Sequence, residues 1–114
     1  MVAPGSYDIT IHQGATFQMQ VAYKNPSGVP INMSGYTVEA QLWNRLGTAK
    51  LANFASSWTD QTSGVFLLSL ASNVTSGITE QGQYDVMVTE PSGNKNYLLQ
   101  GNAFVDLGLT GRGL

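Results

Sequence analysis

The sequence contains no cysteine and only one histidine, His12, among its 114 residues. Without cysteine there is no disulfide scaffold, thiolate zinc site, iron–sulfur cluster or cysteine nucleophile. A single histidine also excludes a multi-histidine metal site. The composition therefore predicts that the protein uses no metal and no other cofactor.

Charge is equally scarce, since charged residues make up 11% of the chain and the net charge is −2. Nucleic-acid binding depends on clustered basic side chains, and the basic residues here are scattered: Lys24, Arg45, Lys50, Lys95 and Arg112. No apolar run approaches the about 20 residues of a membrane span. The first six residues have neither the basic nor the apolar region of a secretory signal. We expect no nucleic-acid partner, no membrane partner and no secretion.

Neutral polar residues take the place of charge. Serine, threonine, asparagine and glutamine supply 36 of the 114 residues, and there are 13 glycines. Apolar residues recur at every second position in several segments, which is typical of strands with one buried face. The inward faces are predicted to carry Phe17, Met19, Val21 and Tyr23, then Val38, Ala40 and Leu42, then Tyr84, Val86 and Val88.

This pattern predicts an all-β fold, a two-sheet antiparallel β-sandwich with immunoglobulin-like connections and seven to eight strands. A small barrel is the alternative architecture. We expect residues 1–6 to be a flexible N-terminus, residues 7–106 to form the sandwich and residues 107–114 to be an extended arm. Residues 45–63 are the least regular part, with residues 51–54 and 57–59 as candidate short strands. Residues 71–79 favour a single helical turn, and Gly101 suggests a β-bulge.

Tyr84 stands at the start of a late strand, two residues after Gly82 and after a polar crossover. This is the position of a tyrosine corner, in which the phenol hydrogen-bonds to the backbone upstream. We therefore predict structural roles for Tyr84 and Gly82.

No set of residues carries a catalytic pattern. Asp8 and His12 share a strand face, but four strand residues span about 13 Å, too far for a hydrogen bond between them. The remaining carboxylates lack the spacing of a calcium loop or a glycosidase pair: Asp60, Glu80, Asp85, Glu90 and Asp106. We expect these groups to be solvated surface residues and the protein not to be an enzyme.

Exposed aromatic and leucine residues are the candidates for contact. Trp43 falls on the polar side of its strand, and Trp58 falls in the irregular stretch. Such a tryptophan either caps a sandwich edge, anchors a protein interface, or stacks on a sugar ring. Tyr97 is a third candidate platform. Leu107, Leu109 and Leu114 alternate with glycine in a tail that is either frayed or docks on a neighbouring subunit.

Several turns and core segments occur together in a recognisable order. They are Ile11–Phe17 (IHQGATF), Gly28–Tyr36 (GVPINMSGY), Ala40–Leu42 (AQL), Gly64–Leu70 (GVFLLSL), Gly82–Val86 (GQYDV), and Pro91–Gly93 (PSG) with Leu98–Gly101 (LLQG). This set resembles the small immunoglobulin-like module of tailed-bacteriophage virion proteins, of which the N-terminal domain of baseplate upper proteins is an example. Physically, Gly14 and Gly35 suit tight turns, and Asn32 and Ser34 suit local hydrogen bonds to the backbone.

The resemblance implies a non-enzymatic virion protein, assembled in the host cytoplasm with other virion proteins and as a homo-oligomer in the particle. It is expected to join tail, baseplate, neck or fibre components. Because the sequence stops at Leu114 without a fibre region, an adaptor role is favoured over receptor binding. The alternatives are a capsid decoration protein and a carbohydrate-binding module that uses Trp43, Trp58 or Tyr97.

Overall fold

The computed structural model describes residues 5–107, and within that range the regular secondary structure is almost entirely β-strand. The strands are β1 (Gly5–Ser6), β2 (Ile9–His12), β3 (Phe17–Ala22), β4 (Thr37–Asn44), β5 (Lys50–Asn53), β6 (Ala55–Asp60), β7 (Val65–Leu70), β8 (Gly82–Thr89) and β9 (Lys95–Asp106). A 3-10 turn, η1 (Gln61–Ser63), and one helical turn, α1 (Ser72–Thr75), complete the set.

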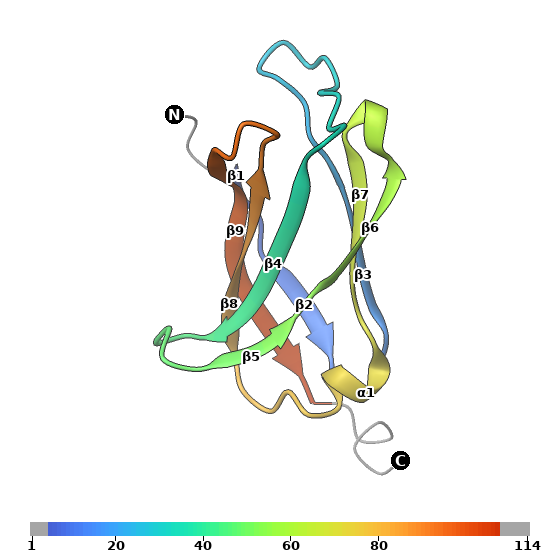
Figure 1. Cartoon of the computed structure of the whole chain (residues 1–114). Helices are drawn as coiled ribbons and strands as arrows, with labels where there is room; N and C mark the ends of the chain where they lie inside the picture. Colours follow the sequence, from blue (N-terminus) through green and yellow to red (C-terminus); the bar gives the residue numbers. More distant parts are fainter. Residues whose placement is uncertain (1–4, 108–114) are drawn as a thin grey trace.

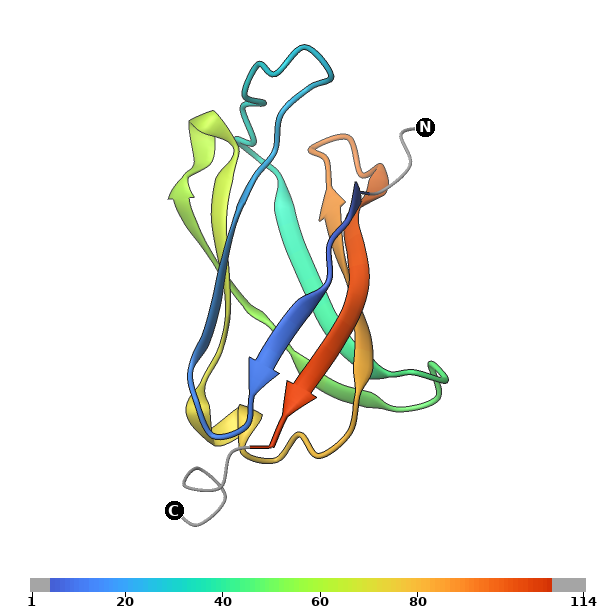
Figure 2. The ribbon, with the colours of Figure 1, turned by 180° about the vertical axis from the view of Figure 1, so that it is seen from behind.

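The strands form two sheets that face each other (Figure 1). One sheet has the order β1-β9-β8-β4-β5, with β2 also paired to β9, and the other has the order β3-β7-β6. Both β1 and β2 run parallel to β9, as seen for β2 in Figure 2, whereas the other pairs are antiparallel. The predicted immunoglobulin-like β-sandwich is therefore confirmed. Counting the short pieces separately gives nine strands in residues 5–107 rather than seven or eight.

The core lies between the sheets and follows from the two-residue alternation in the sequence. In β8 the buried positions alternate with exposed or half-exposed ones, and in β7 they alternate with half-exposed ones. The side chains that are essentially inaccessible include Ile11, Leu42, Phe66, Leu68, Val86 and Val88. Each buried aliphatic or aromatic side chain of this size contributes about 1.5–3 kcal/mol through removal of apolar surface from water.

The N-terminal boundary and the role of Gly101 differ from expectation. Gly5 and Ser6 pair with Leu99 and Gln100, so the sheet begins inside the segment that was predicted to be flexible. Gly101 is in register with Tyr84, and the bulge lies at Leu98 instead, where the β8–β9 register shifts. Gly101 is required for another reason: a β-carbon there would lie 2.0 Å from the Tyr7 carbonyl oxygen. Tyr7 belongs to the short connection between β1 and β2, which we call the β1–β2 crossing.

Tyr84 is buried and structural, as predicted, but its hydrogen bond is not the local one of a tyrosine corner. Its hydroxyl donates to the backbone carbonyl of Tyr7, which belongs to the N-terminal strand region and not to the preceding crossover. The phenol therefore ties β8 to the β1–β2 crossing. Gly82 is structural because a β-carbon would lie 2.4 Å from the Trp43 carbonyl oxygen.

The predicted turns are present. Gly14 and Gly35 adopt φ values of 86° and 82°, which side chains disfavour. The Asn32 side chain accepts hydrogen bonds from the Ser34 backbone N–H at 2.9 Å and the Ser34 hydroxyl at 2.7 Å. The local side-chain bonding expected for this motif is thus confirmed.

Candidate functional site

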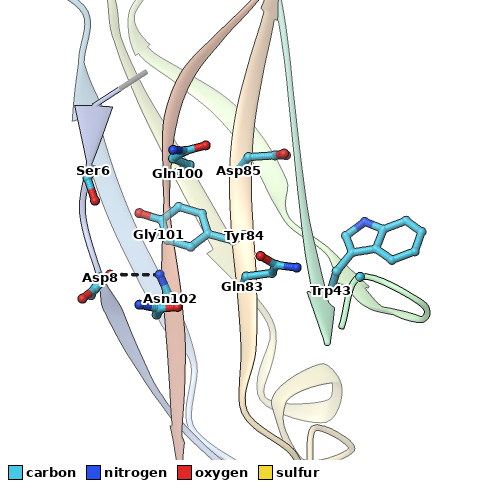
Figure 3. A pocket seen from close by; sticks show the side chains of 10 residues that line it. Ser6, Asp8, Trp43, Gln83, Tyr84, Asp85, Gln100, Gly101 and Asn102 are labelled. Carbon is cyan, nitrogen blue, oxygen red and sulfur yellow. Dashed lines mark hydrogen bonds between the residues drawn. The ribbon is translucent and has the colours of Figure 1, made fainter. Parts of the chain in front are cut away.

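The outer face of the larger sheet carries a polar hollow of about 490 Å³ (Figure 3). It is lined by Ser6, Asp8, Trp43, Gly47, Gln83, Tyr84, Asp85, Gln100, Gly101 and Asn102. These residues come from both ends of the chain and from its middle. The fold, and not local sequence, therefore assembles the hollow.

Strand register explains how the lining side chains come together. One row across the sheet contains Asp85 on β8, with Gln41 on β4 and Gln100 on β9 as its lateral neighbours. The next row places Gln83 between Trp43 and Asn102. Because side chains two residues apart on a strand point to the same face, both rows present their side chains outward.

Several lining groups are held in place by hydrogen bonds. The Trp43 indole N–H donates to Gln41 Oε1 at 2.9 Å, which fixes the ring on the sheet. The Asn102 backbone N–H donates to Asp8 Oδ1 at 2.9 Å, drawn as a dashed line in Figure 3. The hollow is therefore built on strands and preorganised.

Asp85 and Glu90 are both half-buried carboxylates, but Glu90 accepts a hydrogen bond from the Asn96 side chain. Burial raises the pKa of the Asp85 carboxyl group above the ordinary value. Among the hydrogen bonds of residues 5–107, none engages the Asp85 side chain. A ligand that donates a hydrogen bond to the Asp85 carboxylate would stabilise its partly desolvated charge.

The electrostatic character of the hollow limits what it binds. Its lining contains two carboxylates and three amides but no lysine, arginine or histidine. In the described part of the chain, no three His, Cys, Asp or Glu side chains gather as a metal site would require. The arrangement suits an uncharged polar ligand, because the lining offers both hydrogen-bond donors and acceptors. It has no basic side chain that could neutralise an anionic ligand.

A second, more apolar groove of about 260 Å³ opens between β4 and β6, where the two sheets diverge. It is lined by Tyr36, Thr37, Val38, Ser56, Ser57, Trp58 and Phe66. The Trp58 ring packs edge-on against Phe66, with 6.0 Å between ring centroids, and the side chain remains 38% exposed. Trp58 therefore lies in the edge strand β6, within the candidate strand of residues 57–59 and next to the register shift between Trp58 and Asp60.

The structure does not bring the candidate contact residues into one site. Trp43 lines the polar hollow and Trp58 lines the groove, whereas Tyr97 lines neither and is 53% exposed on β9. Leu107 is exposed just beyond β9. Leu109 and Leu114 lie outside the described residues.

As predicted, Asp8 and His12 do not pair with each other. Both side chains are exposed, but each has a different partner: His12 Nδ1 lies 3.5 Å from Asp106 Oδ2, and Asp8 holds the Asn102 backbone. Sequence reasoning missed Gln83, Gln100 and Asn102 as members of one site. Their signal was present, since Gln83 stands at an outward position of β8, and Gln100 and Asn102 stand two residues apart on β9.

Comparisons with known proteins bear on the fold alone. No family model and no curated protein matches this chain. Among solved structures, the chain is similar to one in the crystal structure of ICOS in complex with ICOS-L and an anti ICOS-L VNAR domain. The TM-score is 0.55 at 11% identity, and the match covers 90% of this chain and 56% of that chain. This likeness supports the immunoglobulin-like sandwich.

Residues 5–107 contain no helix with the length and apolar character that a membrane crossing requires.

Proposed function

We propose that this chain is a non-enzymatic structural module of a tailed-phage virion, which joins tail, baseplate, neck or fibre components by protein–protein contacts. Two observations support the proposal. The turn and core segments resemble those of the phage module over residues 7–106. The groove between β4 and β6 also presents an exposed tryptophan beside an open sheet edge.

The exposed edge of β6 is the strongest structural support for a protein–protein contact. All six residues of β6 are exposed, and β6 is the last strand of its sheet. An uncovered edge offers unpaired backbone groups to another strand, and an exposed tryptophan is a frequent anchor of protein interfaces. The occupant is an extended segment of another virion protein, which pairs with β6 and packs against Trp58. A stable joint would bury about 800 Å² on each partner.

Immunogold electron microscopy of phage particles, with antibody against the purified chain, tests the location. Gold at the tail tip, baseplate or neck supports the adaptor. Gold spread over the head contradicts the adaptor role and supports the alternative, a capsid decoration protein. Intact particles without label, together with a denatured virion that shows no band in a blot, contradict the virion assignment.

Particle assembly in a phage that carries variant chains tests the interface. Trp58→Ala is expected to reduce the amount of chain in purified particles at least tenfold, because it removes the interface anchor. Trp43→Ala is the matched control, since Trp43 lies on the other sheet and is expected to leave incorporation unchanged. Thermal unfolding of both variants separates loss of contact from loss of fold. Equal incorporation of a folded Trp58→Ala chain would exclude this edge as the joint.

A further inference from the structure

The polar hollow on the outer face has features that a protein–protein joint at β6 does not use. It lies on the other sheet from β6, and its lining is dominated by amides and carboxylates, with one tryptophan at its margin. A solvated sheet face has no need to hold Trp43 by a hydrogen bond to Gln41 or to keep the carboxylate of Asp85 half-buried. These features point to a ligand.

We propose that this hollow binds a neutral oligosaccharide, with Trp43 packing against a sugar ring and Asp85, Gln83, Gln100 and Asn102 pairing with sugar hydroxyls. The proposal does not rest on a virion role, because it follows from the geometry of this face alone.

The hydrogen-bonding inventory of the hollow matches sugar hydroxyls. A hydroxyl both donates and accepts, and an amide side chain offers both functions as well. Among residues 5–107, the side chains of Asp85 and Gln100 make no hydrogen bond to the protein, so their capacity is free for a ligand. A carboxylate accepts only, and its hydrogen bonds from hydroxyls are stronger than those between neutral groups.

The tryptophan supplies the apolar component. A pyranose ring has a face of C–H groups that packs on an indole ring, while its hydroxyls point outward to polar partners. Trp43 is half-buried and lies at the end of a row of polar side chains, across β8 from Asn102. Figure 3 shows the Trp43 ring turned away from Gln83 and Asn102, so a sugar that packs on this ring extends along the row beyond Gln83.

Charge and size narrow the ligand class. Asp8 and Asp85 disfavour anionic sugars, and the lining contains no basic side chain to bind a phosphate, a sulfate or a sialic acid. The volume of about 490 Å³ falls in the range of about 300–1,000 Å³ that small-molecule sites occupy. A neutral oligosaccharide fits the chemistry better than a charged one.

The first experiment presents the full chain to immobilised maltotetraose, cellotetraose, chitotetraose and mannotetraose, within an array of neutral and sialylated glycans. We expect saturable binding to a neutral glycan and none to its sialylated counterpart. Failure of every neutral glycan to exceed the Trp43→Ala background would overturn the proposal. Preferential binding of sialylated glycans would also overturn it.

The second experiment locates the site by fluorescence titration with the neutral oligosaccharide that binds best on the array. Trp58→Phe leaves Trp43 as the single tryptophan of the chain, so its emission is expected to shift on binding. Asp85→Asn and Gln100→Ala are each expected to weaken binding about tenfold, or about 1.4 kcal/mol. Trp58→Ala should bind normally, although it fails to assemble. Unchanged affinity in both Asp85→Asn and Gln100→Ala would refute this site, whatever the particle assay finds.

Discussion

The hydroxyl of Tyr84 donates a hydrogen bond to the backbone carbonyl of Tyr7, a residue 77 positions earlier in the chain. Tyr84 is buried in β8, and Tyr7 lies where the chain crosses from β1 to β2. One phenol therefore joins the central part of the larger sheet to its N-terminal edge.

Tyr84→Phe is expected to lower the free energy of unfolding at pH 7 by about 1–2 kcal/mol. The substitution removes one hydrogen bond and leaves a backbone carbonyl without its partner, while the ring still fills the same space. Urea denaturation of the two proteins measures the difference. Tyr97→Phe is the control, because that tyrosine is exposed and its loss should change stability little.

The same tyrosine predicts a dependence on alkaline pH. Burial raises the pKa of Tyr84 from 10.0 to about 12 in the folded protein. The folded state then keeps a proton that the unfolded state loses, so the contribution of Tyr84 is complete below pH 10 and is lost as pH rises through about 12. The stability difference between wild type and Tyr84→Phe should shrink over this interval. A difference that stays constant from pH 8 to pH 12 would contradict the assignment.

Gly101→Ala is expected to destabilise the fold by about 1–3 kcal/mol, the usual cost of forcing extra atoms into a packed site. The new β-carbon would lie 2.0 Å from the Tyr7 carbonyl oxygen, so the β1–β2 crossing must move. Gly77→Ala is the matched control, since its nearest contact is an ordinary 3.6 Å. Hydrogen exchange of the β1 and β2 amides should rise in Gly101→Ala only. If both variants unfold at the same denaturant concentration, the crossing is not closely packed.

The faces of β4, β7 and β8 could be predicted because each buries one side, and burial imposes a period of two on the sequence. The segment that contains Trp58 gave a weaker signal. All six residues of β6 are exposed, so no alternation between apolar and polar residues marks its full length, and only residues 57–59 were a candidate strand.

The candidate site was harder to predict for a different reason. Asp8 and the Asn102 backbone are joined by a hydrogen bond across 94 positions, and Gln83 meets Trp43 through strand pairing. A single sequence shows which side chains point outward but not which strands are neighbours. The bulge at Leu98 adds one residue to β9, which changes the register on either side of it.

Thr75 lies at the opposite end of the sandwich from the β8–β9 turn, and its hydroxyl leads to a further prediction. This residue is fully buried in α1; its hydroxyl accepts from the Gly14 backbone N–H at 3.1 Å and donates to the Ala15 carbonyl at 2.8 Å. Thr75→Val keeps the shape and leaves both backbone groups unpaired, so we expect a loss of about 2 kcal/mol in urea denaturation. The exposed Thr79, changed to valine, is the control. Equal stability of both variants would mean that the hydroxyl does not hold the β2–β3 turn.

Asp85→Asn is expected to stabilise the protein at pH 7. Burial raises the pKa of the Asp85 carboxyl above 3.8, so its favourable contribution is complete below pH 3.8 and is lost as pH rises through the folded-state pKa. At neutral pH the wild type holds a partly desolvated charge that the amide avoids, and the gain should vanish when the carboxyl is protonated. Thermal unfolding at pH 7 and at pH 3.5 measures both limits, and repetition in 1 M salt removes long-range charge effects. A less stable Asp85→Asn at pH 7 would mean that the carboxylate has a favourable partner within the fold. The expected result, a variant that is more stable but binds sugar less well, would mean that the carboxylate is kept for its ligand at a cost in stability.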